Sequence, residues 1–312
     1  MKKFFLASLC LWASFVALAQ KGQENFEKAR IFLEKEDYKN ALKWIDLAIQ
    51  DDPNQVDFYN SKGLILKNLE RYQDAFEVWS FGITQFPDDP FVYYNRGVLL
   101  LEAGDFEYAN KDFTSAIEKT KNDTLISSFL QNRAVTYSRV QEFQKAYDDL
   151  ILAHELDQTN IGILVNLGGV CDEVGKGEET LKFLKMALAL DSTYLPIYGN
   201  IGYKYQEMGD YQTAISYYNK VISLDPNEPL GYSNRAYNYY KLGRLDLALQ
   251  DINKSIKMYP TNSYAYRVRA LIHIAENRTN LACEDLQKAL DLNFTLSYGD
   301  EVIGLKKQYC GK

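Results

Sequence analysis

The sequence has few of the residues on which catalytic and metal sites usually depend. Its 312 residues include only 2 histidines and 4 cysteines. His154 and His273 lie far apart in the chain, and neither has a carboxylate or cysteine at the spacing of a metal site. A phosphate-binding glycine loop and a nucleophile elbow are also missing. We therefore expect a non-catalytic protein without a metal or other cofactor.

Positive charge is scarce as well. The chain has 35 lysines and arginines against 42 aspartates and glutamates, which gives a formal net charge of −7. An acidic chain without a basic patch is a poor ligand for nucleic acid or anionic lipid. We expect no nucleic-acid partner.

The N-terminus has the pattern of a signal peptide over residues 1–19. Lys2 and Lys3 are followed by an uncharged apolar run, residues 4–19, and Ala17-Leu18-Ala19 forms a small-x-small cleavage site. The run is shorter than the roughly 20 residues that a membrane-spanning helix needs. We expect cleavage before Gln20, a periplasmic or secreted protein, and no membrane insertion after cleavage. A retained N-terminal anchor and a lipid-carrying Cys10 are the alternatives.

The rest of the chain repeats itself, with a small residue recurring at a step of 34. The recurring positions are Ala41, Ala75, Ala109, Ala146, Thr180, Ala214, Ala248 and Ala282. Every interval is 34 residues except the one from Ala109 to Ala146, which is 37. Twelve residues before each of them lies a second small residue, in order Ala29, Gly63, Gly97, Ala134, Gly168, Gly202, Ala236 and Ala270. Small residues at fixed intervals allow neighbouring helices to approach closely.

Proline and glycine mark the ends of the repeated elements. All 7 prolines fall at repeat junctions, where a helix has ended or is in its first turn. Gly104, Gly175, Gly209 and Gly243 recur at the fifteenth position of their repeats, where a helix that ends in a left-handed residue favours glycine, and Asn277 occupies the same position. Each unit is therefore predicted to be helix, tight turn, helix, turn.

Residues 195–228 resemble a tetratricopeptide repeat, with an aromatic residue at position 4, glycine at 8, tyrosine at 11, alanine at 20 and proline at 32. The resemblance implies an all-α protein, a right-handed α-solenoid of eight helix-turn-helix repeats plus a C-terminal capping helix. The eight units span residues 22–55, 56–89, 90–123, 127–160, 161–194, 195–228, 229–262 and 263–296, within a repeat region of residues 20–296. Residues 124–126 predict a longer turn between the third and fourth units, and residues 297–312 predict the capping helix, over residues 300–309.

In this family the first helix of each unit carries binding, through positions 2, 5, 6, 9, 12 and 13, which face a concave groove. Position 6 is asparagine in five consecutive units: Asn95, Asn132, Asn166, Asn200 and Asn234. Asparagine amides can pair with the main chain of an extended peptide, or they can tie neighbouring helices together, and both readings stay open. The other candidate groove residues are Phe91, Tyr94, Asp172, Glu173, Tyr203, Glu207, Tyr237, Tyr240, Lys241, Tyr264 and Arg267.

These features indicate a protein–protein interaction scaffold that binds a polypeptide in its groove. Some family members clamp the C-terminal carboxylate of chaperones with lysine, asparagine and arginine, but no unit here has asparagine at position 9 or a basic residue at position 2. The partner's identity does not follow from the sequence. The alternative is a permanent structural subunit of a cell-envelope assembly for secretion, motility or outer-membrane function.

A disulfide is expected between Cys283 and Cys310. Signal cleavage removes Cys10, and Cys171 takes a core position in the fifth unit where a small apolar thiol can stay unreacted. Cys283 is one turn into the last second helix, and Cys310 ends the capping helix, so antiparallel packing brings the two together. Two free thiols are the alternative.

Thiol counting checks this expectation. The protein without its signal peptide, denatured but not reduced, should show one reactive thiol, that of Cys171, because an exported protein meets an oxidising compartment. A count of three would contradict the disulfide.

Overall fold

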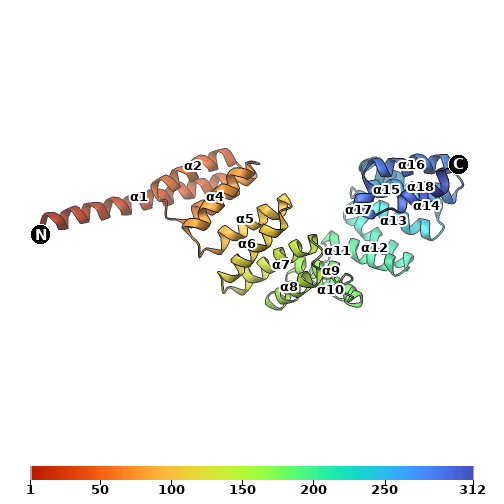
Figure 1. Ribbon diagram of the computed structural model, residues 1–312, viewed down its shortest axis with the longest axis horizontal. Coiled ribbons are helices and arrows are strands. Elements are labelled where there is room, and N and C mark those ends of the chain that lie inside the picture. Colours follow the sequence, from red (N-terminus) through yellow and green to blue (C-terminus); the bar gives the residue numbers. More distant parts are fainter. Residues whose placement is uncertain (1, 312) are drawn as a thin grey trace. The chain divides into compact units, whose positions relative to one another are not determined.

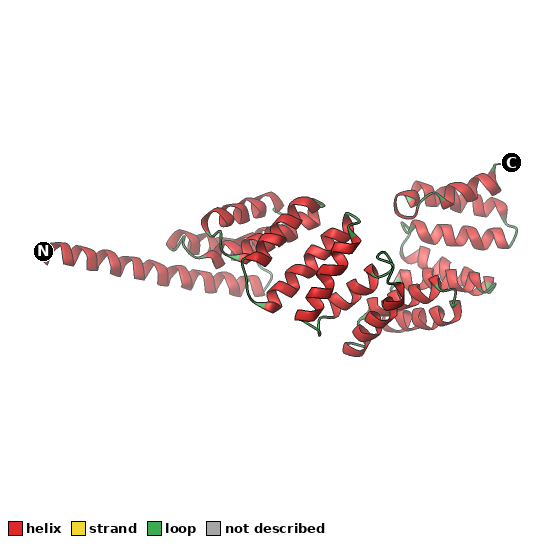
Figure 2. Cartoon of the chain, turned by 60° about the horizontal axis from the view of Figure 1, so that its bottom comes forward, coloured by secondary structure: helices red, strands yellow, loops and turns green. Residues whose placement is uncertain are grey.

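The computed structural model describes residues 2–311, with side chains described from residue 17 on. Every regular element in that part of the chain is a helix, coloured red throughout Figure 2. The chain forms two compact units, residues 1–163 and 164–312. The expectation of an all-α chain of paired helices is confirmed.

The helices follow one another in pairs, most of which are labelled in Figure 1. Those before the unit boundary are α1 (Lys2–Glu34), α2 (Tyr38–Asp51), α3 (Val56–Asn68), α4 (Tyr72–Gln85), α5 (Pro90–Ala103), α6 (Phe106–Glu118), α7 (Asp123–Arg139) and α8 (Phe143–Leu156). The boundary falls within α9 (Ile161–Val170). The second unit continues with α10 (Gly177–Leu190), α11 (Leu195–Glu207), α12 (Tyr211–Leu224), α13 (Pro229–Lys241), α14 (Leu245–Met258), α15 (Ser263–Ala275), α16 (Thr279–Asp291), α17 (Phe294–Tyr298) and α18 (Glu301–Cys310).

In the first unit α1 to α8 pack one after another, each against the next, and in the second unit α10 to α18 do the same. First helices also contact each other, α3 with α5 and α5 with α7 in the first unit, and α11 with α13 and α13 with α15 in the second. Each unit therefore has a face made of adjacent first helices, and residues at equivalent positions of successive repeats lie next to one another there.

A small residue on each first helix packs against a bulky residue sixteen positions later on the second helix. The bulky residues are, in chain order, Ile45, Trp79, Phe113, Leu150, Leu184, Tyr218, Ile252 and Leu286, and none of them is more than 1% exposed. The aromatic residues face glycine: a Cβ on Gly97 or Gly202 would lie 3.0 Å from the ring of Phe113 or Tyr218, and one on Gly63 would overlap the indole of Trp79. Alanine faces the aliphatic residues, with Gly168 opposite Leu184 as the exception.

Four repeats add a buried ion pair one position earlier on the same two helices. Each arginine donates from Nε and Nη2 to both oxygens of an aspartate sixteen residues on, in the pairs Arg96–Asp112, Arg133–Asp149, Arg235–Asp251 and Arg269–Asp285. Nη1 of the same arginine donates to a side chain of the preceding repeat's second helix: Ser80, Thr114, Asn219 or Asn253. Each arginine thus joins three helices, and loss of one partner from such a pair costs on the order of 3–5 kcal/mol.

The turns between paired helices use left-handed residues, as predicted for Gly104, Gly175, Gly209, Gly243 and Asn277. The sequence did not reveal that Glu36, Glu70 and Gln141 take the same conformation in three other repeats, with φ of 57°, 58° and 62°. A non-glycine residue pays roughly 1–2 kcal/mol for this backbone. Packing of the two flanking helices therefore imposes the turn even where the side chain opposes it.

The inserted residues 124–126 do not lengthen a turn, which corrects the expectation. They form the first turn of α7, which begins at Asp123. The Oδ1 atom of Asn122 accepts a hydrogen bond from the backbone N–H of Leu125 at 3.1 Å, and Asp123 places negative charge at the helix N-terminus. The extra residues are absorbed because this cap starts the helix early.

The first helix continues through the expected cleavage site. Residue 20 lies inside α1, and the expected repeat helix is the C-terminal part of this element. Side chains of the apolar run before residue 17 lie outside the described residues. Among the residues that could be searched, none of the helices is both long and apolar enough to span a membrane.

The second unit ends in two helices instead of one. Between α16 and the capping helix α18 lies the short helix α17, which the repeat pattern did not indicate. Phe294 and Val302 from these helices are buried in a cluster with Tyr266 and Leu286. The sulfur atoms of Cys283 and Cys310 are bonded, with the Cα atoms 5.7 Å apart, and the bond joins the end of α18 to α16. Cys171 is a buried free thiol, and burial raises its pKa to about 11.

The small-against-large contact gives a test by double substitution. Gly63→Ala should destabilise the protein by about 1–3 kcal/mol because the methyl group overlaps Trp79. Trp79→Leu, which copies the partner of alanine in other repeats, should cost on the order of 3 kcal/mol alone. The loss of unfolding free energy in the double variant should be smaller than the sum of the two single losses by at least about 1 kcal/mol. Denaturant unfolding measures all three.

Gly199→Ala is the matched control, because an added Cβ there meets nothing within 4 Å. It should be neutral or stabilising by about 0.5–1 kcal/mol, since alanine is the better helix former. Additive effects at residues 63 and 79 would show that the contact does not set the helix spacing.

Candidate functional site

A groove in the second unit gathers five of the predicted binding residues. Its cavity measures about 390 Å³ and is lined by Tyr203, Gln206, Leu230, Ser233, Asn234, Tyr237, Asn262, Tyr264, Arg267, Phe294, Tyr298 and Glu301. We call this the tyrosine groove. The structure thus brings Tyr203, Asn234, Tyr237, Tyr264 and Arg267 together.

The groove is built by the first helices and closed by the terminal ones. Helices α11, α13 and α15 supply residues from positions 2, 5, 6, 9 and 12 of their repeats, which share one helix face because each helix turns once per 3.6 residues. Phe294 and Tyr298 come from α17, and Glu301 comes from α18. Sequence reasoning missed these three. Glu301 could have been found from the register, because it follows Arg267 by 34 residues and so occupies position 5 of the truncated ninth unit.

Aromatic rings follow one another along the groove, with Phe294 buried at one end of the series. The ring centroids of Tyr237 and Tyr264 are 6.4 Å apart, those of Tyr264 and Tyr298 5.7 Å, and those of Phe294 and Tyr298 4.8 Å. Tyr203 is 52% exposed at the other end of the groove lining. Such rings offer a large contact area with a polar edge, which suits recognition of a peptide.

Arg267 lies among these rings. Its guanidinium is 5.1 Å from the ring centroid of Tyr237 and 5.8 Å from that of Tyr264. Nε donates to Oε2 of Glu301 at 3.0 Å and Nη2 to Oε1 at 2.5 Å. Burial by itself lowers the pKa of Arg267, but the hydrogen bonds and charge of Glu301 outweigh it and raise that pKa above its ordinary value. Arg267 is a fixed positive charge in an aromatic setting.

Two buried polar groups beside the groove lack a hydrogen-bond partner among the described residues. One is the Nδ2 amide of Asn262, which lines the cavity, and the other is the hydroxyl of Tyr218. Burial raises the pKa of Tyr218 far above its usual range, and the charges of Tyr264, Tyr203 and Glu207 raise it further. The Tyr218 hydroxyl therefore remains a neutral donor beneath the groove.

The predicted acidic groove residues Asp172, Glu173 and Glu207 do not line this cavity, and they are partly neutralised. Helix α9 ends at Val170, so Asp172 and Glu173 belong to a turn instead of a helix face, as expected for a segment that contains two adjacent glycines. Lys204 pairs with Asp172 and lies 3.8 Å from Glu207. Sequence reasoning missed this lysine.

The remaining candidates of the second unit do not line the cavity. Lys241 lies 5.5 Å from the ring of Tyr211, and the ring centroid of Tyr240 is 6.3 Å from that of Tyr237. The negative charge that Tyr237 can carry raises the pKa of Lys241. Asn166 is half-buried and Asn200 is exposed.

Four predicted residues belong to the first unit. The ring of Tyr94 stacks on Phe129 at 4.7 Å, and Phe91 meets Phe129 edge-on at 6.3 Å. Asn95 donates to the side chain of Asn60 on the preceding first helix, and Asn132 donates to the Tyr94 hydroxyl and to the Ser128 carbonyl. These two asparagines tie helices together, as the alternative interpretation of the series expects, whereas Asn234 faces the tyrosine groove.

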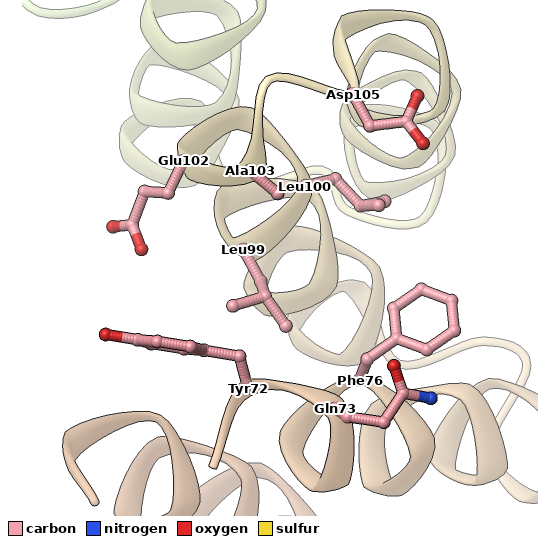
Figure 3. Close-up of a pocket in the computed structure, with 8 residues that line it drawn as sticks. All are labelled: Tyr72, Gln73, Phe76, Leu99, Leu100, Glu102, Ala103 and Asp105. Atoms are coloured by element: carbon pink, nitrogen blue, oxygen red, sulfur yellow. The ribbon is translucent and has the colours of Figure 1, made fainter. Parts of the chain in front are cut away.

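A second cavity, of about 570 Å³, lies in the first unit between the start of α4 and the end of α5 (Figure 3). Leu99 points between Tyr72 and Phe76, with Glu102 and Asp105 at the rim. Glu102 is paired with Lys67 at 2.6 Å. This cavity contains none of the predicted binding residues and is mainly apolar.

No group of three or more histidine, cysteine, aspartate or glutamate side chains is placed to hold a metal ion in the part of the chain that could be searched. His273 is buried, and its burial lowers its pKa below the usual histidine range. His154 belongs to the other unit.

Two segments of the second unit match the tetratricopeptide repeat family, residues 196–228 and residues 229–262. The TPR repeat-containing protein PA4667 of Pseudomonas aeruginosa is 22% identical over 153 residues, which are 47% of this chain and 25% of that protein. This chain thus spans about a quarter of the length of that relative.

Solved structures show the same architecture. A chain of the APC/C hetero-tetramer Cut9–Hcn1 is similar with a TM-score of 0.65 and 16% identity, over 86% of this chain and 52% of that chain. A tetratricopeptide repeat protein from Parabacteroides merdae is similar with a TM-score of 0.50 and 19% identity, over 94% of this chain and all of that chain. These likenesses establish the fold, and repeats of this kind generally form scaffolds for protein–protein interaction.

The unpartnered Tyr218 hydroxyl predicts an unusual response to substitution. Tyr218→Phe should raise the free energy of unfolding by about 1 kcal/mol, because it removes a buried donor that has no acceptor. Tyr232→Phe is the control, since that hydroxyl donates to the Pro226 carbonyl at 3.1 Å and accepts from Lys254 at 2.6 Å. Tyr232→Phe should lower the free energy of unfolding by about 1 kcal/mol. Denaturant unfolding compares the two, and a loss at Tyr218 would show that its hydroxyl is paired.

Proposed function

Because the chain is a tetratricopeptide-repeat protein, we propose that it binds an extended segment of another polypeptide in the tyrosine groove, without catalysis. The observation that carries this proposal is the convergence of Tyr203, Asn234, Tyr237, Tyr264 and Arg267 on one cavity. These residues come from three successive first helices, so a ligand must run across several repeats to meet them.

The chemistry of the groove suits a peptide better than a compact metabolite. Its aromatic rings offer apolar contact, while Asn234 and Gln206 supply amide groups that can pair with a main chain. Asn238 donates to Oε1 of Gln206 at 2.7 Å and so fixes the orientation of that amide. Residues that are already held in place lose little entropy when a ligand binds, which favours affinity.

A permanent place in a cell-envelope assembly is the second candidate. The terminal helices leave Leu296 84% exposed and Ile303 48% exposed, beside the half-exposed Tyr298. Apolar side chains at the end of a repeat stack mark a surface on which another subunit could continue the packing. Extraction from native membranes separates the candidates: a stable large complex favours the permanent subunit, and a soluble monomer favours reversible binding.

We also propose export to the periplasm or the cell exterior, on the basis of the signal-peptide pattern. Cleavage before Gln20 would leave residues 20–34 as the first helix of the first repeat, still packed on α2. N-terminal sequencing of the protein from its native cells should find Gln20. An intact Met1 in the membrane fraction would contradict export.

Selection of peptides on the full chain tests groove binding. A phage-displayed library of random dodecapeptides should yield binders, and Tyr203→Ala should weaken them at least about fivefold, as expected for a groove aromatic at a hot spot. Tyr203 is suited to this test because it is 52% exposed, so its loss disturbs the fold little.

Tyr259→Ala is the matched control. Tyr259 is 45% exposed at the C-cap of α14 and does not line the groove. Its variant should bind the selected peptides like the unaltered protein. Failure to select any binder, or equal effects of the two tyrosine variants, would count against binding in the groove.

A further inference from the structure

The ion pair at the closed end of the tyrosine groove differs from the four arginine–aspartate pairs that join first and second helices, which we call the structural pairs. Arg267 and Glu301 hold equivalent positions of the eighth repeat and of the truncated ninth, so both side chains belong to the groove-facing register. The four structural arginines instead pair with aspartates on second helices, away from that face. The Arg267–Glu301 pair therefore occupies the place where a ligand would bind.

The two partners also differ in exposure. The side chain of Arg267 is 11% exposed, whereas that of Glu301 is 45% exposed. In the structural pairs the aspartate is the buried member, at 7–11%. A half-exposed glutamate in the first turn of the terminal helix can turn into solvent at small cost, because water then replaces its hydrogen bonds. Arg267 cannot leave, since it is enclosed by Tyr237 and Tyr264.

Two hydrogen-bond donors of the groove lining lack an acceptor among the described residues. Nη1 of Arg267 makes no hydrogen bond to the described residues, whereas each structural arginine uses Nη1 to bind a neighbouring helix. The buried Nδ2 amide of Asn262 is also unpartnered in the described part of the chain. A guanidinium with an N–H group that lacks an acceptor can bind a carboxylate.

We propose that Glu301 takes, in the free groove, the place of an acidic side chain of the bound polypeptide, and that the ligand's Asp or Glu exchanges with it on Arg267. This inference rests on the proposed function, since it names the ligand's chemistry. The group that binds Arg267 in the free groove, Glu301, is itself a side-chain carboxylate. This geometry favours a side-chain carboxylate of the ligand over a terminal one.

The exchange has a physical rationale. A guanidinium at the base of an aromatic groove would be an uncompensated charge if it had no partner, which is strongly destabilising. Glu301 neutralises it while the groove is empty. A neutral or basic segment that displaces Glu301 leaves Arg267 unpaired, whereas an acidic segment restores the bidentate pair, so the internal glutamate sharpens specificity.

The test uses the full chain and small probes that carry a single functional group. N-acetyl-glutamate amide supplies a side-chain carboxylate, N-acetyl-glycine a terminal carboxylate, N-acetyl-glutamine amide a neutral isostere, and N-acetyl-lysine amide a cation. Binding is followed by the NMR signal of the Arg267 Nε–H group, assigned with Arg267→Lys. The variants are Glu301→Gln, Glu301→Asp and, as a matched loss of charge outside the groove, Glu284→Gln on the exposed side of α16.

Glu301→Gln should bind N-acetyl-glutamate amide about tenfold more tightly than the unaltered chain, if the glutamate occupies Arg267 about nine-tenths of the time. Glu301→Asp, whose carboxylate is one methylene shorter, should fall between them, and Glu284→Gln should change nothing. The glutamine probe should bind all variants equally weakly. The proposal would be overturned if the glutamate probe bound Glu301→Gln no more tightly than the unaltered chain. It would also be overturned if the unaltered chain bound the lysine probe more tightly than the glutamate probe.

Tighter binding of the acetyl-glycine probe than of the glutamate probe would overturn the assignment to a side-chain carboxylate. These outcomes do not depend on the peptide selection. A chain that selects no peptide but shows the tenfold effect would refute groove binding of polypeptides while leaving the carboxylate exchange intact.

Discussion

The contact between a small residue on each first helix and a bulky residue sixteen positions later sets how closely the two helices of a repeat approach. Glycine faces Trp79, Phe113 and Tyr218, and alanine faces isoleucine or leucine in four other repeats, so the sum of the two volumes is roughly constant in seven repeats. Gly168 opposite Leu184 is the exception. Protein interiors are packed densely enough that one extra methyl group is felt. Helix pairs of uniform thickness can stack in register, and that register aligns positions 2, 5, 6, 9 and 12 of neighbouring repeats along the tyrosine groove.

Much of this architecture could be predicted from the sequence because its signals are local. The small residues, the prolines at the junctions and the left-handed glycines act within one repeat, so the repeating helix pairs follow from composition and spacing alone. The structure differs from the prediction where contacts with neighbouring elements determine the local backbone conformation. Glu70 takes a glycine's backbone conformation because the flanking helices require it. Residues 124–126 extend α7 because Asn122 caps the helix early, and α9 ends early at a pair of glycines.

The candidate site was predicted in part, for the same reason. Helix periodicity places Tyr203, Asn234, Tyr237, Tyr264 and Arg267 on the groove face, and the structure gathers them in one cavity. Periodicity does not show which side chains of different repeats pair with one another. The pairing of Lys204 with Asp172, the use of Asn95 and Asn132 to join helices, and the closure of the groove by Tyr298 and Glu301 all depend on contacts between residues about 30 or more positions apart. A length-34 register extended beyond the last full repeat would have found Glu301.

The second unit thus combines a rigid stack of helix pairs with a groove whose aromatic walls surround one fixed positive charge. We propose that this face, and not the second helices, meets the partner. Photo-crosslinking in the native cells tests it most directly, with a photoreactive amino acid at residue 203 in the groove or at residue 216 on the exposed side of α12. We expect a polypeptide adduct from position 203 and none from position 216. Adducts from position 216 without any from position 203 would contradict the account.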